Sequence, residues 1–114
     1  FVYDDQPPSI TILHPVNGTT YTSLSEINGT ATDNENPIAN VYIHIRNNNT
    51  AKYWNGTAWV SNPVNLPCTY NTTTHIWNYT NLPTWQSNNN YTISAFATDV
   101  AGNVKSTWAW FRYQ

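Results

Sequence analysis

Two acidic turns carry the residues of this chain that are best suited to bind a cation. Ala31-Thr32-Asp33-Asn34 and Ala97-Thr98-Asp99 each end a run of alternating residues in a turn that contains a carboxylate. Carboxylate and amide oxygens are hard ligands, and calcium takes about six to eight of them. The alternative is that Asp33 and Asp99 accept hydrogen bonds from turn amides and bind no ion, because the sequence has no calcium-loop spacing.

A second chemistry is the attachment of N-linked glycans at Asn-x-Ser/Thr sequons. Seven sequons are present, and they begin at Asn17, Asn28, Asn48, Asn55, Asn71, Asn78 and Asn90. Composition alone would give about three or four by chance, so the excess favours glycosylation, with an unmodified Asn-rich surface as the alternative. Inward-facing residues flank Asn28 and Asn78, so we expect both to point to solvent, and we expect the other five to fall in or beside turns.

Aromatic residues are more numerous than a core of this size has to bury. The surplus residues that we expect to contact a glycan or another subunit are Tyr53, Trp54, Trp59, Trp85, Trp108 and Trp110. Flat rings stack on sugars, which predicts a carbohydrate-binding or adhesive module. The same rings could instead be buried between neighbouring copies or beneath attached glycans, which predicts a structural unit.

The spacing of the reactive residues gives little support for catalysis. His14, His44 and His75 form no pattern with Ser and acid residues, and they lack the spacing of zinc ligands. Glu26 offers no partner carboxylate for sugar hydrolysis. Cys68 is the single cysteine, so we expect a small buried hydrophobe, with pairing to another chain as the alternative. The sequence therefore predicts neither an enzyme nor a required cofactor.

Length and charge restrict the class of protein further. With 114 residues the chain is long enough for one domain with a modest core. It has 4 Lys and Arg residues against 6 Asp and Glu residues, so it lacks the basic surface that nucleic acids require. No apolar stretch reaches the roughly 18 residues of a membrane helix. We expect no nucleic-acid partner and no membrane insertion.

The elements that must position these residues are short strands without helical periodicity, which is typical of an all-β sandwich. We place seven strands near residues 9–13, 24–32, 38–46, 51–60, 74–80, 91–98 and 104–113. Asn55-Gly56 is the strongest hairpin signal. Loops are expected around three prolines, Pro63, Pro67 and Pro83. Trp77 and Tyr91 are core candidates, and the hydroxyl of Tyr91 should bond to nearby backbone as in a tyrosine corner.

Five short motifs are distributed along the chain. They are Pro8-Ser-Ile-Thr-Ile, Pro15-Val-Asn-Gly, Ile27-x-Gly-x-Ala31-Thr-Asp-Asn, Val41-x-Ile43 and Tyr91-x-Ile-x-Ala-x-Ala-Thr-Asp-x-Ala-Gly-Asn103. Over about residues 7–113 the chain thereby resembles the immunoglobulin-like repeats of prokaryotic surface and secreted proteins. The resemblance implies a Greek-key sandwich of about seven antiparallel strands, an extracellular or cell-surface location, and no common active site. The aromatic segment from Tyr53 to Tyr70 is longer than the usual middle of such repeats.

The fold that this resemblance implies would bring the acidic residues together. In an immunoglobulin-like sandwich the loop after the second strand and the final hairpin lie at one pole, where the N-terminal linker enters. The oxygen ligands gathered there would be those of Asp4, Asp5, Asp33, Asn34, Glu35, Asp99 and Asn103. This set is our candidate calcium site at the junction between domains.

The two ends of the chain also suggest a repeating arrangement. Phe1-Val2-Tyr3 resembles Phe111-Arg112-Tyr113, and each triplet lies where a last strand would end. We interpret residues 1–6 as a linker, the end of a preceding repeat or a donated strand, and residues 7–114 as the domain, with a chance match as the alternative. The sequence thus predicts a non-catalytic, N-glycosylated extracellular building block of a surface protein or filament, with neighbouring copies as its partners.

Overall fold

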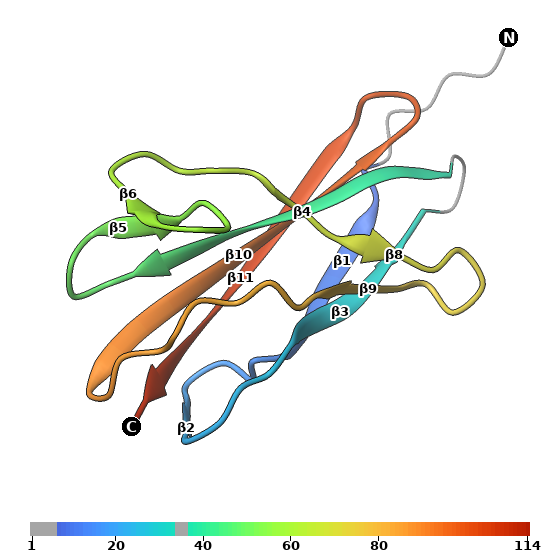
Figure 1. Ribbon diagram of the computed structural model, residues 1–114. Helices are drawn as coiled ribbons and strands as arrows, with labels where there is room; N and C mark the ends of the chain where they lie inside the picture. Colours follow the sequence, from blue (N-terminus) through green and yellow to red (C-terminus); the bar gives the residue numbers. More distant parts are fainter. Residues whose placement is uncertain (1–6, 34–36) are drawn as a thin grey trace, which may run out of the picture.

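The computed structural model describes residues 7–33 and 37–114, and the only regular elements within these ranges are β-strands (Figure 1). The strands are β1 (Ser9–His14), β2 (Thr19–Tyr21), β3 (Ile27–Thr32), β4 (Ile38–Asn47), β5 (Lys52–Trp54), β6 (Trp59–Val60), β7 (Leu66–Pro67), β8 (Thr69–Tyr70), β9 (Ile76–Tyr79), β10 (Asn89–Asp99) and β11 (Val104–Tyr113). None of the described residues forms a helix long and apolar enough to span a membrane. The all-β prediction is confirmed.

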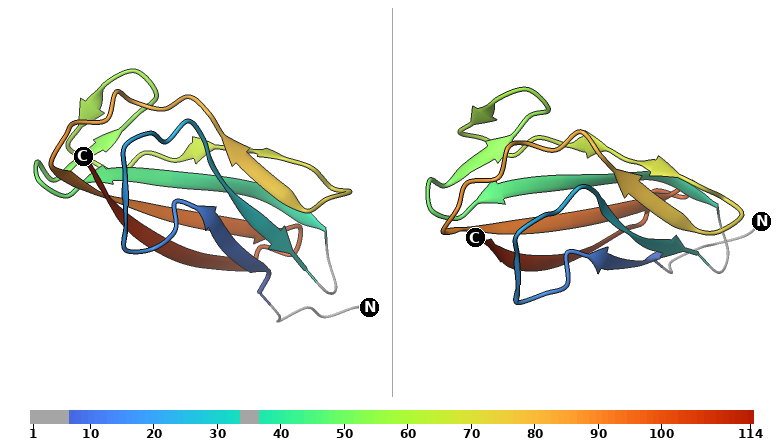
Figure 2. Two further views of the ribbon diagram at one scale, coloured as in Figure 1. Left: turned by 90° about the horizontal axis from the view of Figure 1, so that it is seen from below. Right: turned by 60° about the horizontal axis from the view of Figure 1, so that its bottom comes forward.

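Two sheets pack face to face as a sandwich (Figure 2). The smaller sheet has the order β1-β3-β9-β8, and the larger has the order β2-β11-β10-β4-β5-β6, with β7 paired to β4 on the same edge as β5. Strands distant in sequence, such as β4 and β10, lie side by side, so the chain crosses repeatedly between the sheets. These features confirm the immunoglobulin-like sandwich that the motifs predicted.

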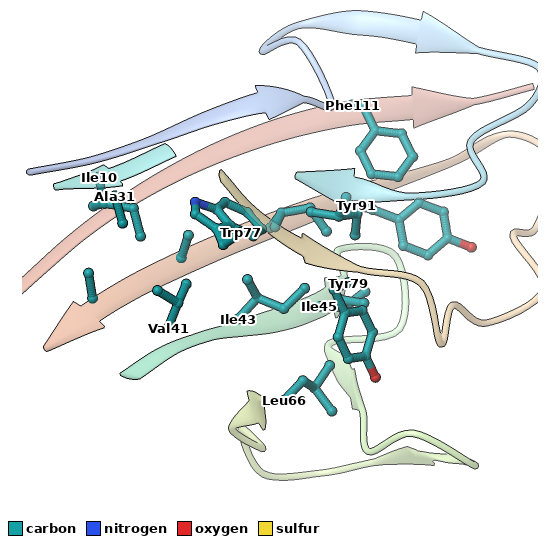
Figure 3. Packing of buried hydrophobic residues seen from close by; sticks show 14 residues of the cluster. Ile10, Ala31, Val41, Ile43, Ile45, Leu66, Trp77, Tyr79, Tyr91 and Phe111 are labelled. Atoms are coloured by element: carbon teal, nitrogen blue, oxygen red, sulfur yellow. The ribbon is translucent and has the colours of Figure 1, made fainter. Parts of the chain in front are cut away.

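The core lies between the inner faces of the two sheets and follows directly from the alternation of the strands (Figure 3). The largest fully buried hydrophobic side chains include Trp77, Tyr91, Phe111, Ile27, Ile43, Ile45 and Ile93. Along β10 every second residue from Tyr91 to Ala97 is fully enclosed, which is the pattern that the sequence indicated for this segment. The core thus fixes which residues of each strand face outward and are available for function.

Gly29 allows an unusually close approach between the strands of the smaller sheet. A Cβ atom at this position would stand 1.9 Å from the carbonyl oxygen of Thr11 and 2.7 Å from the ring of Trp77. The indole Nε1–H of Trp77 donates a hydrogen bond to the same Thr11 oxygen at 3.1 Å. Glycine is therefore required here for lack of space, and it lets the largest core side chain lie against the backbone of β1.

Tyr91 behaves as the tyrosine corner that the sequence predicted. Its ring is fully buried, and its hydroxyl accepts a hydrogen bond from the N–H of Gln86, five residues upstream, at 2.8 Å. Tyr21 repeats this geometry without having been predicted, since its hydroxyl accepts from the N–H of Val16 at 2.8 Å. Two tyrosines thus fasten the chain segments that lead into β2 and β10.

The hairpin predicted at Asn55-Gly56 is confirmed, and it overturns a neighbouring expectation. The N–H of Asn55 donates to the carbonyl of Ala58 at 2.9 Å, and Gly56 has a φ of +101°, which favours glycine. One continuous strand at 51–60 is therefore wrong, because this turn divides the segment into β5 and β6. The existence of β2, β7 and β8, each only two or three residues long, was not predicted either.

The loop expected around Pro67 is also wrong. Leu66 and Pro67 form β7, in which Pro67 pairs with Tyr42 of β4. Proline is tolerated because β7 lies at the edge of the sheet, where a missing donor leaves no neighbour unsatisfied. The next residue restores the pairing, since the N–H of Cys68 donates to the carbonyl of Val41 at 2.9 Å. Pro63 and Pro83 lie outside strands, as expected.

Candidate functional site

The final hairpin is held by the side chain of Asp99, of which only 3% is exposed. Its Oδ1 accepts hydrogen bonds from the N–H groups of Ala101 at 3.0 Å and Asn103 at 2.9 Å, and its Oδ2 accepts one from Asn103 Nδ2 at 3.1 Å. Gly102 completes the turn with a φ of +93°. These are the turn hydrogen bonds that we gave as the alternative to calcium binding.

Opposing effects act on the pKa of Asp99. Burial of the carboxyl raises the pKa, whereas hydrogen bonds from Asn103 and Ala101 and an interaction with the side chain of Asp33 lower it. The hydrogen bonds prevail, so the pKa of Asp99 lies below its ordinary value. The interaction with Asp33 also shows that the two acidic turns meet, and the N–H of Val100 donates to the carbonyl of Pro37 beside them at 3.2 Å. The two acidic turns therefore lie at one end of the sandwich, which we call the acidic pole, whereas the N-terminal linker that we expected there lies outside the described residues.

The rest of the candidate calcium set lies outside the described residues. It consists of Asp4, Asp5, Asn34 and Glu35. Within residues 7–33 and 37–114, no group of three or more His, Cys, Asp or Glu side chains is placed to hold a metal ion. Asp33, Asp99 and Asn103 are brought together, but calcium binding at this pole stays a prediction.

Three sequon asparagines lie in turns, where the backbone holds their carboxamide oxygens. Asn55 Oδ1 accepts from the N–H groups two and three residues later, at 2.9 and 2.7 Å, and Asn71 Oδ1 does the same at 2.8 and 3.0 Å. Asn17 Oδ1 accepts from the N–H of Trp110 at 3.0 Å. All three side chains are exposed, as expected for sequons in turns.

Asn28 and Asn78 lie opposite each other on the outer face of the smaller sheet. Both point outward as expected, yet both are half-buried. Asn28 Nδ2 donates to Glu26 Oε1 at 2.9 Å, and Asn28 Oδ1 lies 3.0 Å from Nδ1 of His14. Asn78 Oδ1 is enclosed and accepts no hydrogen bond from the described residues. These two carboxamides are part of the packed sheet surface.

Asn48 and Asn90 lie on the outer face of the larger sheet, near the end of the domain where β11 ends. Asn48 follows β4, and its Nδ2 donates to Thr92 Oγ1 at 2.9 Å while its Oδ1 accepts from Arg46 at 2.8 Å. Asn90 is the second residue of β10, and its Oδ1 is enclosed. Both asparagines are half-buried. Their side chains are therefore integrated into the sheet face, although they lie beside turns as expected.

Three of the six aromatic residues that we regarded as surplus belong to the core. Trp54, Trp59 and Trp85 are partly buried and pack against the core cluster. The ring of Trp85 meets those of Tyr91 and Phe111 edge to face, at centroid distances of 4.8 and 5.2 Å. Its Nε1–H donates to the carbonyl of Leu24 at 3.0 Å. The surplus of aromatic residues is therefore smaller than expected, and contact of these three rings with a glycan or another subunit stays a prediction.

Trp108 and Trp110 are exposed on β11, with 61% and 37% of their surfaces open. Three outward residues of β10 and β4 on the same side of the sheet are also aromatic: the ring of Phe96 stacks on that of Tyr42 at a centroid distance of 4.9 Å and lies 4.7 Å from that of His44. We call this surface the outer aromatic face and define it by Tyr42, His44, Tyr53, Phe96, Trp108 and Trp110. The strand register places these residues on the outer side of the larger sheet, where they span β5, β4, β10 and β11.

Tyr42, His44 and Phe96 belong to this face, although we did not predict them there. The signal was present, because Tyr42 and His44 alternate with the apolar Ile43, and Phe96 lies between two alanines that face the core. An outward aromatic residue on a central strand has to be explained by something beyond the domain or by its neighbours on that face.

The histidines and the cysteine occupy structural positions. His44 Nε2 lies 2.7 Å from Asn65 Oδ1, and His75 Nδ1 lies 3.2 Å from the hydroxyl of Tyr70. Cys68 is half-buried against the core, and burial raises the pKa of its thiol to about 12. The thiol therefore stays protonated at neutral pH, which fits the small hydrophobe that we expected.

A comparison with protein families gives one match over most of the chain. The family model described as a bacterial Ig domain matches residues 8–95. The matched stretch begins just before β1 and ends within β10, so it contains strands of both sheets. A comparison with curated proteins finds no match.

Proposed function

The chain belongs to the family of bacterial Ig domains, and from this premise we propose that it is a non-catalytic structural module of an extracellular protein. In this proposal the domain is a repeating building block of a cell-surface protein or filament, and its principal partners are neighbouring copies joined end to end. Members of this family typically occur in surface and extracellular proteins, which supports the location. N-linked glycans on the domain belong to the same proposal.

The observation that best supports end-to-end contacts is the position of the two ends of the domain. Ser9 at the start of β1 pairs with Thr32, next to the acidic pole. β11 begins at that pole with Val104 and ends with Tyr113 at the opposite end of the sandwich (Figures 1 and 2). A chain that enters at one pole and leaves at the other can be joined in series without turning back. The Asp33 and Asp99 turns would then lie at the junction with the preceding copy.

Intact mass measurement of the native material, combined with glycopeptide mapping, tests this proposal. We expect a parent chain or covalent assembly larger than one domain, with glycan mass on at least one sequon. The result that contradicts the proposal is a single unmodified chain of 13.0 kDa. Chemical cross-linking of the intact surface material adds the geometry, since end-to-end contacts should link Lys105 near the acidic pole to the C-terminal end of a neighbour.

The outer aromatic face favours a second candidate function, which is carbohydrate binding or adhesion. Exposed indoles beside neutral hydrogen-bonding side chains such as Ser94 and Thr92 suit the apolar face and the hydroxyls of a sugar ring. Quenching or a shift of tryptophan fluorescence on titration with soluble polysaccharide tests this function. Trp108→Ala should abolish the response, whereas Leu13→Ala, which removes an exposed side chain on the other sheet, should leave it unchanged. Equal responses of both variants would contradict binding at this face.

A further inference from the structure

The seven sequons are not equivalent in the folded domain, and we propose that N-linked glycans are attached at Asn17, Asn55 and Asn71 only. The sequons that stay unmodified begin at Asn28, Asn48, Asn78 and Asn90. This assignment rests on the proposed N-glycosylation and adds to it the identity of the modified sites. It follows from which atoms of each carboxamide the fold already uses.

The chemistry of attachment sets the first requirement. Asn Nδ2 forms a bond to the anomeric carbon of an oligosaccharide carried on a lipid phosphate, and the bond from that carbon to the phosphate oxygen breaks. The lipid phosphate leaves with the electron pair, and Nδ2 loses one proton to a base of the transferase. The product keeps Oδ1 and a single N–H. A suitable asparagine therefore uses Oδ1 for its structural role and leaves Nδ2 unengaged.

The three turn asparagines satisfy this requirement. The backbone N–H groups that hold Asn17, Asn55 and Asn71 all donate to Oδ1, which glycosylation leaves intact. None of the described residues accepts a hydrogen bond from Nδ2 of Asn17, Asn55 or Asn71, and all three side chains are exposed. In the Asn55 sequon the Thr57 hydroxyl also lies 3.0 Å from Asn55 Oδ1, so the two side chains that define a sequon face the same way.

Asn28 and Asn48 fail the requirement because each uses Nδ2 as a donor. Asn28 donates to Glu26 Oε1 and Asn48 to Thr92 Oγ1, both at 2.9 Å. Conversion to a secondary amide removes one of the two N–H bonds and attaches a sugar ring to a nitrogen that already lies against its acceptor. The Asn48 carboxamide is fixed twice more through Oδ1, by Arg46 at 2.8 Å and by the hydroxyl of Thr92 at 3.2 Å.

Asn78 and Asn90 fail a second requirement, which is access of the transferase to the whole tripeptide. The central residues of these sequons, Tyr79 and Tyr91, are 8% and 0% exposed because they point into the core. The backbone of Asn90 is moreover paired with β11 through Arg112, inside a sheet that continues on both sides of β10. The central residues of the turn sequons, by contrast, lie at the surface.

Steric crowding adds a third argument on the smaller sheet. Asn28 and Asn78 are direct partners across β3 and β9, and partners in an antiparallel pair have Cβ atoms about 5 Å apart. A glycan on one would cover the other. All of these obstacles are features of the folded domain, so the assignment applies to a transferase that acts on the folded chain.

The assignment has a consequence for the surfaces of the domain. The β5–β6 hairpin and the turn after β8 lie at opposite ends of the sandwich (Figures 1 and 2), and Asn17 lies in the link between β1 and β2. Glycans at these three places decorate the periphery. Because Asn48 and Asn90 stay unmodified, no glycan grows from the central strands on the outer face of the larger sheet. The Asn17 glycan lies at the edge of this sheet, beside Trp110, whose N–H donates to Asn17 Oδ1.

Glycopeptide mapping of the domain tests the assignment, after expression in a host whose transferase modifies Asn-x-Thr sequons of folded proteins. The wild-type chain should carry glycans at Asn17, Asn55 and Asn71. The triple variant Asn17→Asp, Asn55→Asp, Asn71→Asp keeps every Oδ1 acceptor and lacks the three nitrogens, so it should fold and lose all glycan mass. Circular dichroism of this variant should match that of the wild-type protein.

A second variant separates folding from local sequence. Trp77→Ala removes the largest core side chain, so the strand sequons should become accessible and gain glycans. If circular dichroism shows this variant to be unfolded and its strand sequons still stay unmodified, or if the triple variant retains glycan at a strand site, the structural assignment is overturned while the proposed N-glycosylation stands. A wild-type chain without any glycan in this host, when an unrelated exposed sequon is modified there, overturns both.

Discussion

Gly29→Ala should destabilise the domain severely, although it adds only one methyl group to a strand. The change reduces the freedom of the unfolded chain, which by itself would stabilise the protein by about 0.4–1 kcal/mol. The new Cβ would stand 1.9 Å from the carbonyl oxygen of Thr11, where ordinary contact begins at 3.4 Å. The clashing atoms of Thr11 are backbone atoms at the centre of a strand pair, and they cannot move aside as the end of a flexible side chain could.

The size of the destabilisation follows from which atoms must move to make room for the new Cβ. Separating β1 from β3 by about 1.5 Å would break the strand hydrogen bonds on either side of Gly29, and each is worth about 1 kcal/mol net. The ring of Trp77, which the Cβ would approach to 2.7 Å, must shift within a filled core, and overpacking of this kind costs about 1–3 kcal/mol. After the gain from the unfolded chain is subtracted, about 3 kcal/mol remains. For a domain of this size the thermal midpoint should fall by about 10–15 °C.

Gly102→Ala is the matched control, since it adds the same methyl group in open space. Nothing lies within 4 Å of a Cβ built there, but the φ of +93° strains any other residue by about 1–2 kcal/mol. Thermal and urea unfolding followed by circular dichroism should therefore rank Gly29→Ala as more destabilising than Gly102→Ala. A reversed order, or a Gly29→Ala variant as stable as the wild type, would show that β1 yields easily and would refute this reasoning.

Four further predictions concern side chains rather than backbone. Tyr91→Phe should cost about 1 kcal/mol in unfolding free energy, because the N–H of Gln86 loses its acceptor; a denaturant midpoint equal to the wild type would argue against the tyrosine corner. Because the pKa of Asp99 is lowered in the folded state, its carboxylate stabilises the domain at pH values above the ordinary Asp pKa, and this contribution is lost as the pH falls through the lowered pKa. The thermal midpoint of Asp99→Asn should therefore depend less on pH in the acid range than that of the wild type, and an unaltered pH dependence would contradict this. Trp108→Ala should change stability by less than about 0.5 kcal/mol, whereas Trp85→Ala should cost about 3 kcal/mol, and equal costs would invalidate the division of the tryptophans into core and surface. Calcium at the acidic pole would raise the thermal midpoint of the full chain, so a midpoint that does not respond to a chelator counts against it.

The long strands could be predicted because two independent signals agree in them: the alternation of residues along the strand and the turn residue at its end. The segment from Tyr91 to Thr98 alternates strictly, and the register of the hairpin follows once Asp99 is recognised as a turn residue. Short strands lack such redundancy. β2, β7 and β8 have two or three residues each, too few to show a period, and they form only because a longer strand offers an unpaired edge. Pro67 belongs to this class, since tertiary pairing overrides its local preference.

The aromatic residues show which part of the outer aromatic face could be predicted from the sequence and which part could not. Alternation alone separates Trp108 and Trp110 from the buried Phe111, so their exposure was accessible from the sequence. Trp85 lies in a loop without any period, and only the path of the chain back across the open end of the sandwich places its ring on Tyr91. Composition therefore overstated the number of aromatic residues left over from the core, and we did not predict the outward aromatic residues of β4 and β10, which are Tyr42, His44 and Phe96.

The energetics of the outer aromatic face favour a role within an array over tight binding by one domain. Tryptophan offers roughly 250 Å² of surface, so covering the exposed parts of Trp108 and Trp110, 61% and 37%, removes about 240 Å² from water. At about 25 cal/mol per Å² this yields about 6 kcal/mol before costs. Association costs about 4–15 kcal/mol in lost freedom, so a single copy would bind weakly or not at all. Copies joined end to end would present the face repeatedly, and the first contact would raise the effective concentration for the next. A face that is too small for one domain is therefore sufficient for the repeating module proposed here, provided that no glycan covers it.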